Sequence, residues 1–412
     1  MTIFLIICVL LCSIYSDTTA GLNLKRSRLK NGAVLISSSI NSDNDSNMID
    51  LFFKNGSTLK FNKKTGLSAL AQDVISYRLK KLSKEIGFRY KSYLEWDYLH
   101  YALFFSQDIT ESDLLKVWSA FYGSTTIDPS DFVFYKNNVS TLIKYDFDHK
   151  AINSSMLGLM SHHKSVYNIG KYGSKEDVDS VQLDEFNNFL HCYINPNNSI
   201  IVLNSKRTES KTKNSLFSVK PCFMDERFSN EEIIKLIVPG RSVVYLSSPK
   251  KNFTIRLGFP SVSCSKKDSL AYDLVSQVLT EDEIISSLSG QIYISNDCYL
   301  NNGTLEIALA NVKKDPDEIV AKIIQRISFL ASNLEQSALL SAKNSLNKKF
   351  FGLLNDTESA LFLIGKSSVC SGDYDSIINY SKKLETLDSA EVKAVLKNLN
   401  YENIFKMYLK QE

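Results

Sequence analysis

The chain has 412 residues, of which 44% are hydrophobic and 23% are charged, and its formal net charge at pH 7 is +3. This composition excludes an intrinsically disordered chain, and the length predicts two domains of ordinary size. The nearly balanced charge, with no basic block and no interleaved aromatic stripe, argues against nucleic acid as a partner.

The first twenty residues have the pattern of an export signal. Residues 3–14 form an apolar run of twelve, which is the length of a signal-peptide core and too short to span a bilayer comfortably. Small and polar residues follow it up to Ala20. We therefore expect residues 1–20 to be removed near Ala20 and the mature chain, without a membrane span, to be exported to the periplasm or secreted. The alternative is an uncleaved N-terminal membrane anchor, because no Lys or Arg precedes the run.

The N-terminal half begins with strands and one well-marked helix. Residues 32–38 and 48–54 alternate in the manner of strands. Residues 65–80 place apolar side chains at spacings of three and four, which predicts an amphipathic helix with one buried stripe. Residues 88–94 and 98–105 are rich in aromatic side chains and flank a tight turn, so we expect a hairpin of two strands.

The middle of the chain carries the predicted domain boundary. A helix is expected over 110–121, which opens with a capping box, and further helical periodicity runs over 178–190 before a short strand. Residues 205–222 are polar and lysine-rich without apolar periodicity, and we place an interdomain linker there. The predicted domains are therefore residues 21–204 and residues 223–412.

The second half repeats this order of elements. The segment Leu270-Ala-Tyr-Asp273 echoes Leu70-Ala-Gln-Asp73 at an offset of 200, at the place where a duplicated half would put it. Asp315 and Pro316 mark the start of a strong helix. The expected strands cover 242–246, 254–259, 291–294 and 304–310, and the expected helices cover 269–279, 334–353 and 389–399.

The cysteines do not form an obvious disulfide framework. Five remain after removal of the signal, at positions 192, 222, 264, 298 and 370. An odd number of widely scattered cysteines favours buried free thiols, with one or two bridges as the alternative.

Short motifs in the N-terminal half carry a family resemblance. Asn31-Gly32 opens the first strand, Gly56-Ser57 follows the second, Gly66 leads into the helix, and Tyr193 to Asn198 lead into a later strand. In this order the chain resembles the insulinase-like zinc peptidases, the family of the mitochondrial processing peptidase and its small bacterial relatives. The resemblance implies an α+β fold of two similar half-domains. Each is a mainly antiparallel sheet with helices packed on one face, and the two form a clam-like chamber.

The same resemblance points to a catalytic helix whose chemistry is missing. In that family the helix bears HxxEH, in which two histidines bind zinc and the Glu acts as general base. Ala69, Gln72 and Asp73 stand at the positions of the first ligand, the base and the second ligand. Ala has no lone pair and Gln cannot take a proton at neutral pH, so only Asp73 could contact a cation. We expect no cofactor in this chain, and zinc only in a catalytic partner.

The third zinc ligand of the family is a Glu on a later helix, and the corresponding region, residues 139–148, contains no Glu. Asp146, Asp148 and His149 could rebuild a metal site with Asp73, which would make the chain an active zinc enzyme. Because that spacing does not match one face of a helix or a strand, we consider this alternative weak.

The second catalytic patch of the family is also changed. There the C-terminal half supplies an Arg and a Tyr that donate to the developing oxyanion of the substrate. Gly290-Gln-Ile-Tyr293 matches the end of the family motif, which makes Tyr293 a candidate substrate-binding residue. The position of the Arg falls near Ser286, and residues 286–290 contain no cation.

Three functions remain open on these observations. The favoured one is a non-catalytic insulinase-like homologue, the helper subunit of a heteromeric zinc peptidase, that holds unfolded peptide by strand addition to a sheet edge. The first alternative is a stand-alone exported protein that binds peptides or proteins. The least favoured alternative is an active zinc metallopeptidase with rebuilt ligands.

Overall fold

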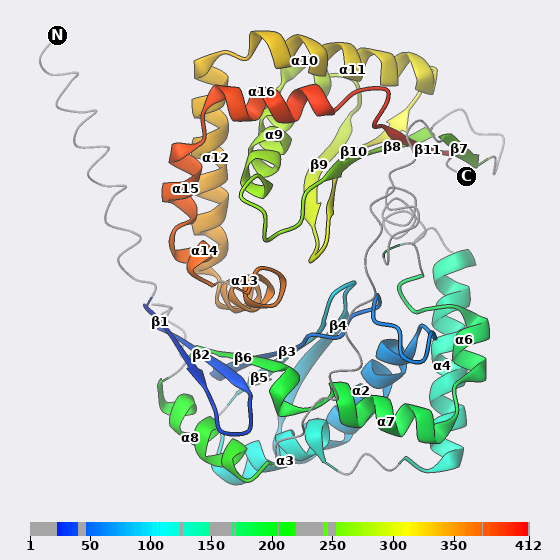
Figure 1. The fold of residues 1–412 in the computed structure, drawn as a ribbon, viewed down its shortest axis with the longest axis vertical. Helices are drawn as coiled ribbons and strands as arrows, with labels where there is room; N and C mark the ends of the chain where they lie inside the picture. Colours follow the sequence, from blue (N-terminus) through cyan, green and yellow to red (C-terminus); the bar gives the residue numbers. More distant parts are fainter. Residues whose placement is uncertain are drawn as a thin grey trace, which may run out of the picture.

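The computed structural model shows two halves, the N-terminal one at the bottom of Figure 1 and the C-terminal one at the top. The residues that it describes are 23–39, 47–106, 108–123, 127–148, 167, 170–204, 206–219, 242–245, 253–372 and 374–410. The predicted signal segment, Cys222 and His149 lie outside them. Among the described residues no helix is long and apolar enough to cross a membrane.

The N-terminal half is built on a six-stranded sheet in the order β1-β2-β6-β3-β5-β4. All neighbouring strands are antiparallel except the parallel pair of β2 and β6. The strands are β1 (Asn23–Arg28), β2 (Val34–Ser39), β3 (Asn47–Phe53), β4 (Phe88–Leu94), β5 (Leu99–Phe105) and β6 (Ser199–Leu203). The predicted hairpin of β4 and β5 is present, and it places β4 at the edge of the sheet.

Helices cover one face of this sheet, where alternate strand residues form a large apolar core with them (Figure 1). The helical elements of this half are α2 (Leu67–Ile86), α3 (Glu111–Tyr122), α4 (Pro129–Asp148), α6 (Lys175–Ser180), α7 (Leu183–Tyr193), η2 (Pro196–Asn198) and α8 (Lys206–Phe217). The predicted capping box is present at the start of α3, where Thr110 and Asp113 bond each other's backbone.

Helix α8 lies within the predicted linker, where we expected no regular structure. Its inner face is made mostly of small polar residues, Thr208, Thr212 and Ser215, which are buried together with Leu216. The Trp118 indole donates a hydrogen bond of 2.8 Å to Ser215 Oγ. Small hydroxyl side chains at spacings of four and three leave no apolar period, which is why the sequence did not reveal the helix.

The C-terminal half has a five-stranded sheet in the order β7-β11-β8-β10-β9, in which only β7 and β11 run parallel. Its strands are β7 (Ser242–Tyr245), β8 (Phe253–Ser261), β9 (Gln291–Cys298), β10 (Gly303–Val312) and β11 (Phe405–Lys410). Its helices are α9 (Ser269–Glu281), α10 (Glu283–Ser286), α11 (Pro316–Asn333), α12 (Gln336–Asn355), α13 (Thr357–Cys370), α14 (Asp375–Ile378), α15 (Tyr380–Thr386) and α16 (Ser389–Asn398).

The two halves share one building plan. In each, a long helix packs against the edge strand of an antiparallel hairpin: α2 against β4 in the first half and α9 against β9 in the second. The sequence echo at an offset of 200 falls on these two helices, with Asp73 in α2 and Asp273 in α9. Each of these carboxylates accepts a hydrogen bond from an Asn amide, at 2.9 Å from Asn138 and at 2.8 Å from Asn296. The α+β prediction of two similar halves is confirmed.

Helix α13 joins the halves. It belongs to the C-terminal part of the chain but packs on β3 and β6. It covers the face of the first sheet that the helices of the N-terminal half leave open (Figure 1). The approach is closest at Gly365, where an added Cβ would lie 2.0 Å from Cε2 of the buried Phe52 ring. The first sheet is therefore covered on both faces, whereas we expected helices on one face only.

Substitution of Gly365 by Ala is expected to lower the free energy of unfolding by about 1–3 kcal/mol, because the new methyl group overpacks a filled core. The Phe52 ring cannot move away freely, since it stacks on His100 at 4.3 Å between ring centres. Gly352→Ala in α12 is the matched control, because an added Cβ there meets no atom within 4 Å. We expect it to be neutral or slightly stabilising in the same denaturant titration. Equal effects of the two substitutions would contradict the close approach.

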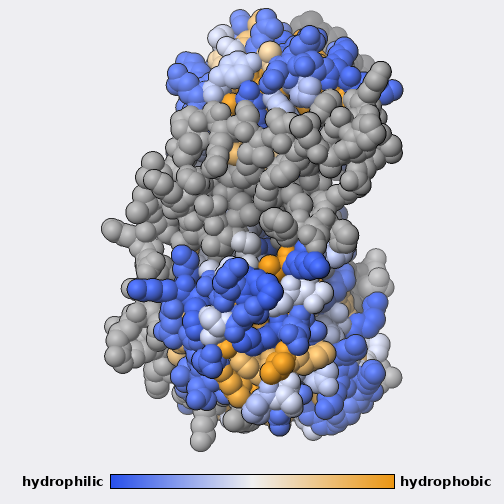
Figure 2. All heavy atoms as spheres, turned by 90° about the vertical axis from the view of Figure 1, so that its right-hand side faces the viewer, coloured by the Kyte–Doolittle hydropathy of each residue, from blue (hydrophilic) through white to orange (hydrophobic). Residues whose placement is uncertain are grey.

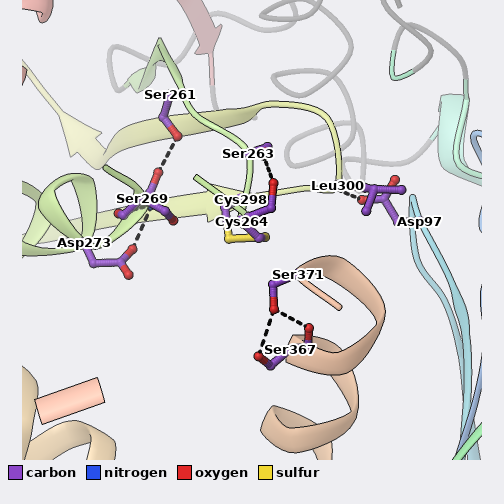
Figure 3. Close-up of a disulfide and its surroundings, with 12 residues drawn as sticks. Asp97, Ser261, Ser263, Cys264, Ser269, Asp273, Cys298, Leu300, Ser367 and Ser371 are labelled. Carbon is purple, nitrogen blue, oxygen red and sulfur yellow. Dashed lines mark hydrogen bonds between the residues drawn. A yellow bond between two sulfur atoms is a disulfide. The ribbon is translucent and has the colours of Figure 1, made fainter. Parts of the chain in front are cut away.

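The tips of the two hairpins also meet, next to a disulfide (Figure 3). The backbone amide of Leu300 donates a hydrogen bond of 2.7 Å to Asp97, and the Tyr167 hydroxyl donates one of 2.8 Å to the same carboxylate. The bridge of Cys264 and Cys298 lies directly before this tip of the second half. A buried carboxylate of the first half is thus satisfied in part by backbone of the second.

Burial raises the pKa of Asp97 to about 6, although both hydrogen bonds favour its charged form. The folded state therefore binds this proton more tightly than the unfolded chain, in which the carboxyl titrates near 3.8. The resulting stabilisation is fully present below about pH 4 and is lost as the pH rises through about 6.

We expect Asp97→Asn to remove this dependence. The difference in unfolding free energy between wild type and variant should change by about 1–3 kcal/mol between pH 4 and pH 7, in favour of the wild type at low pH. Denaturant titrations of both proteins across this pH range measure this difference in unfolding free energy. The contributions of the other carboxyl groups are the same in both proteins and cancel. Parallel pH profiles would contradict the assignment.

Candidate functional site

The site is built on α2, whose start is fixed by a glycine. Gly66 caps the helix with a φ of 84°, and an added Cβ would lie 2.5 Å from a methyl group of Val178. The predicted stripe, which includes Leu67, Leu70 and Val74, is buried against the first sheet. Ala69 is only 3% exposed and belongs to the same core. At the position that the resemblance assigns to the first zinc ligand, the chain therefore has a methyl group packed in the core.

Gln72, to which the resemblance assigns the position of the general base, is turned toward the edge strand β4. Its amide nitrogen lies 3.4 Å from the Ser92 hydroxyl, which also accepts a hydrogen bond of 3.1 Å from Ser76. Tyr90, on the same side of β4, donates to the backbone oxygen of Ser76 at 2.7 Å. These hydrogen bonds join α2 to the edge strand through amide and hydroxyl groups. All of these groups are neutral, and none can act as a general base that takes a proton from water at neutral pH.

Asp73, to which the resemblance assigns the position of the second ligand, is hydrogen-bonded to an amide. Asn138 of α4 donates a hydrogen bond of 2.9 Å to its Oδ2 atom. Burial raises the pKa of Asp73, an effect that the bond from Asn138 opposes. Asn138 was missed in the sequence, although it directly precedes the region 139–148 in which the third ligand was sought. The structure thus brings Asp73 of α2 together with a neutral residue of α4.

Zinc does not fit this set of residues. A buried methyl group, two amides and one carboxylate do not supply the nitrogen, sulfur and carboxylate donors that zinc prefers. Within the described parts of the chain, no three His, Cys, Asp or Glu side chains are grouped so that they could hold a metal. The rebuilt site remains a prediction, because the side chain of Asp146 and all of His149 lie outside the described residues.

Tyr293 lies on β9, the edge strand of the second sheet. Its side chain is 62% exposed, on the side of the strand away from the core that Ile292 and Ile294 contact. Ser286 ends the short helix α10. Among the described residues, no hydrogen bond or ring contact joins Tyr293 to Ala69, Gln72 or Asp73, so a shared site of these residues remains a prediction.

Both halves present an open strand edge. Among the described residues, β4 pairs only with β5, and β9 pairs only with β10. One side of each strand therefore carries backbone N–H and C=O groups without a strand partner, and such an edge can accept an extended peptide.

Helix α4 carries exposed apolar side chains beside this site. Val133, Phe134 and Leu142 are exposed, with Phe134 at 51%, and the Phe134 ring contacts the exposed Tyr77 of α2. Figure 2 shows the molecule from the right of Figure 1, where hydrophobic groups form patches in a mainly hydrophilic surface of the lower half. Exposed apolar groups gathered in this way are typical of contact surfaces.

Comparison with known proteins identifies the fold. No protein-family model and no curated protein matches the chain. A protease from Helicobacter pylori superposes with a TM-score of 0.78 at 16% identity, over 95% of this chain and 100% of that chain. A peptidase M16 inactive domain from Pseudomonas fluorescens gives 0.78 at 15% identity, over 95% and 99% of the two chains.

A chain of complex III2 from Candida albicans is also similar, with a TM-score of 0.76 and 13% identity over 94% of this chain and 95% of that chain. Identities this low carry the fold and not the activity. The chain therefore has the fold of the M16, or insulinase-like, peptidases, as its sequence motifs suggested.

Proposed function

We propose that the chain is a non-catalytic insulinase-like homologue that works as the helper subunit of a heteromeric zinc peptidase and holds peptide substrates. One observation carries the proposal. The three positions of HxxEH hold a core methyl group, an amide near the edge strand and a carboxylate bonded to Asn138. Such a site keeps the packing of the catalytic helix without its metal or base.

Peptide binding is supported by the open edges of β4 and β9, which supply backbone donors and acceptors without any metal. A partner subunit is supported by the exposed apolar side chains of α4. The similar inactive M16 domain shows that this fold also occurs in a protein described as inactive. The complex III2 chain shows that it occurs within a larger complex.

The disulfide supports export. Cys264 and Cys298 form a bridge, and structural disulfides occur mainly under oxidising conditions, such as the periplasm or the outside of the cell. We propose that the mature chain acts there after removal of residues 1–20.

A second candidate is a stand-alone exported protein that binds peptides without a peptidase partner. It is favoured by the changes in the C-terminal half at the family's second catalytic patch. There, residues 286–290 lack the cation that a helper subunit would use to hold substrate. The two candidates differ in whether a zinc-bearing subunit accompanies the chain.

The absence of catalysis can be tested with a rebuilt site. We expect the purified chain to contain no zinc and to leave quenched fluorescent peptides intact. A variant with the family's ligands and base is expected to gain zinc at about one ion per chain, because α2 and α4 already face each other. Its substitutions are Ala69→His, Gln72→Glu, Asp73→His and Asn138→Glu. Zinc and hydrolysis in the unmodified chain would overturn the proposal.

A further inference from the structure

The outward side chains of β4 form a basic surface along the edge of the first sheet. Along this strand, residues alternate between exposed and inner positions, and Arg89, Lys91 and Tyr93 are the exposed ones. Tyr90 and Ser92, which point the other way, are hydrogen-bonded to α2. A ligand beside β4 therefore meets two cations on one face of the strand.

An aromatic floor holds these two cations in place. The Arg89 guanidinium carbon lies 5.7 Å and the Lys91 Nζ 5.3 Å from the centre of the Phe104 ring on the neighbouring strand β5. Cations held against an aromatic ring keep their stems on the sheet and their charges toward solvent. The next exposed residue, Tyr93, stacks on His100 with 5.5 Å between the ring centres.

The positive charge of this surface is only partly neutralised. Lys91 forms an ion pair with Glu358 at the start of α13, but both side chains are exposed, so the pair contributes little energy. No carboxylate of the described residues pairs with Arg89. The corresponding edge strand of the second half differs, since the exposed residues of β9 are Gln291, Tyr293 and Asp297, with no cation.

We infer that the β4 edge selects extended peptides with acidic side chains at two alternate positions. The inference rests on the proposed function, in which β4 binds peptide by strand addition. In an added strand, side chains on one face recur every second residue and lie about 5 Å from those of the neighbouring strand. Glu or Asp at positions i and i+2 can thus face Arg89 and Lys91, while like charges there are repelled.

The test uses fluorescent peptides of one sequence with Glu, Gln or Lys at the two alternate positions, titrated with the mature chain at low and high salt. We expect the Glu peptide to bind about tenfold more tightly than the Gln peptide, from two partly exposed ion pairs, and the Lys peptide to bind most weakly. High salt should reduce this preference. Arg89→Glu should abolish the preference for the Glu peptide over the Lys peptide, because each peptide then meets one like and one opposite charge, and the milder Arg89→Gln should weaken the preference.

Lys322→Glu is the control, because it makes the same type of charge change on the exposed surface of α11. It should leave the order of affinities unchanged. Equal binding of all three peptides, or equal effects of Arg89→Glu and Lys322→Glu, would overturn the inference and leave peptide binding intact. If none of the peptides binds to the folded chain, the inference and peptide binding both fail.

Discussion

Leu70→Asp is expected to unfold the N-terminal half, with a loss of more than about 4 kcal/mol in the free energy of unfolding. Leu70 is fully buried in the core between α2 and the first sheet. A carboxylate there would have neither water nor a cation to compensate its charge. Far-ultraviolet circular dichroism and limited proteolysis of the purified variant measure the loss.

Asp73→Ala, one turn along the same helix, is the matched control. Asp73 is only partly buried, and its one hydrogen bond from Asn138 is worth about 1 kcal/mol. We expect this variant to remain folded and to bind peptides as the wild type does. A folded Leu70→Asp variant would contradict the assignment of the core, and a loss of bound zinc in Asp73→Ala would contradict the inactive site.

Replacement of Cys264 and Cys298 by Ser is expected to cost about 2–4 kcal/mol of stability in the C-terminal half. The bridge closes a separation of 34 residues between the segment after β8 and the end of β9, and so restricts the unfolded chain. It also lies beside the hairpin tip whose Leu300 amide bonds Asp97 (Figure 3). The second half and its contact with the first should both weaken.

Denaturant titrations of the oxidised wild type, the reduced wild type and the double variant measure this effect. The last two should unfold at the same midpoint, below that of the oxidised protein. Equal midpoints for all three proteins would show that the bridge does not contribute. Cys192→Ser is the control for replacement of a cysteine outside the bridge of Cys264 and Cys298.

Local patterns predicted most elements of the fold. The helix expected over 65–80 is α2, although it continues to Ile86, where Gly87 with a φ of 70° ends it. Its buried stripe was visible because large apolar residues recur at helical spacing. Helix α8 was not visible, because Thr and Ser fill its buried face. Recognition of such a helix requires the surface against which it packs.

Long-range contacts were beyond the sequence for a related reason. Helix α13 packs on β3 and β6 of the N-terminal half, which lie far before it in the chain, and its closest contact is made by a glycine. Cys264 and Cys298 pair because the segment after β8 and the end of β9 lie side by side in the fold, which the sequence does not show. The expectation of buried free thiols was therefore wrong for these two cysteines. Cys370 is a buried free thiol, as expected.

The residues of the candidate site could be predicted from sequence motifs, but the residues that contact them could not. Ala69, Gln72 and Asp73 were found because a family pattern fixed their positions on one helix. Asn138 is 65 residues from Asp73 in sequence, and no local pattern connects an amide on α4 with a carboxylate on α2. Only the packing of the two helices shows that an amide donor faces this carboxylate.

The central claim is that this chain is the metal-free helper of a zinc peptidase. The most direct measurement is purification of the mature chain from its own cells under native conditions, with mass and zinc content determined on the same fraction. The account predicts a complex of fixed ratio with a second, zinc-bearing peptidase chain. A chain that arrives alone and without metal would contradict the helper role, and zinc on the lone chain would contradict the inactive site.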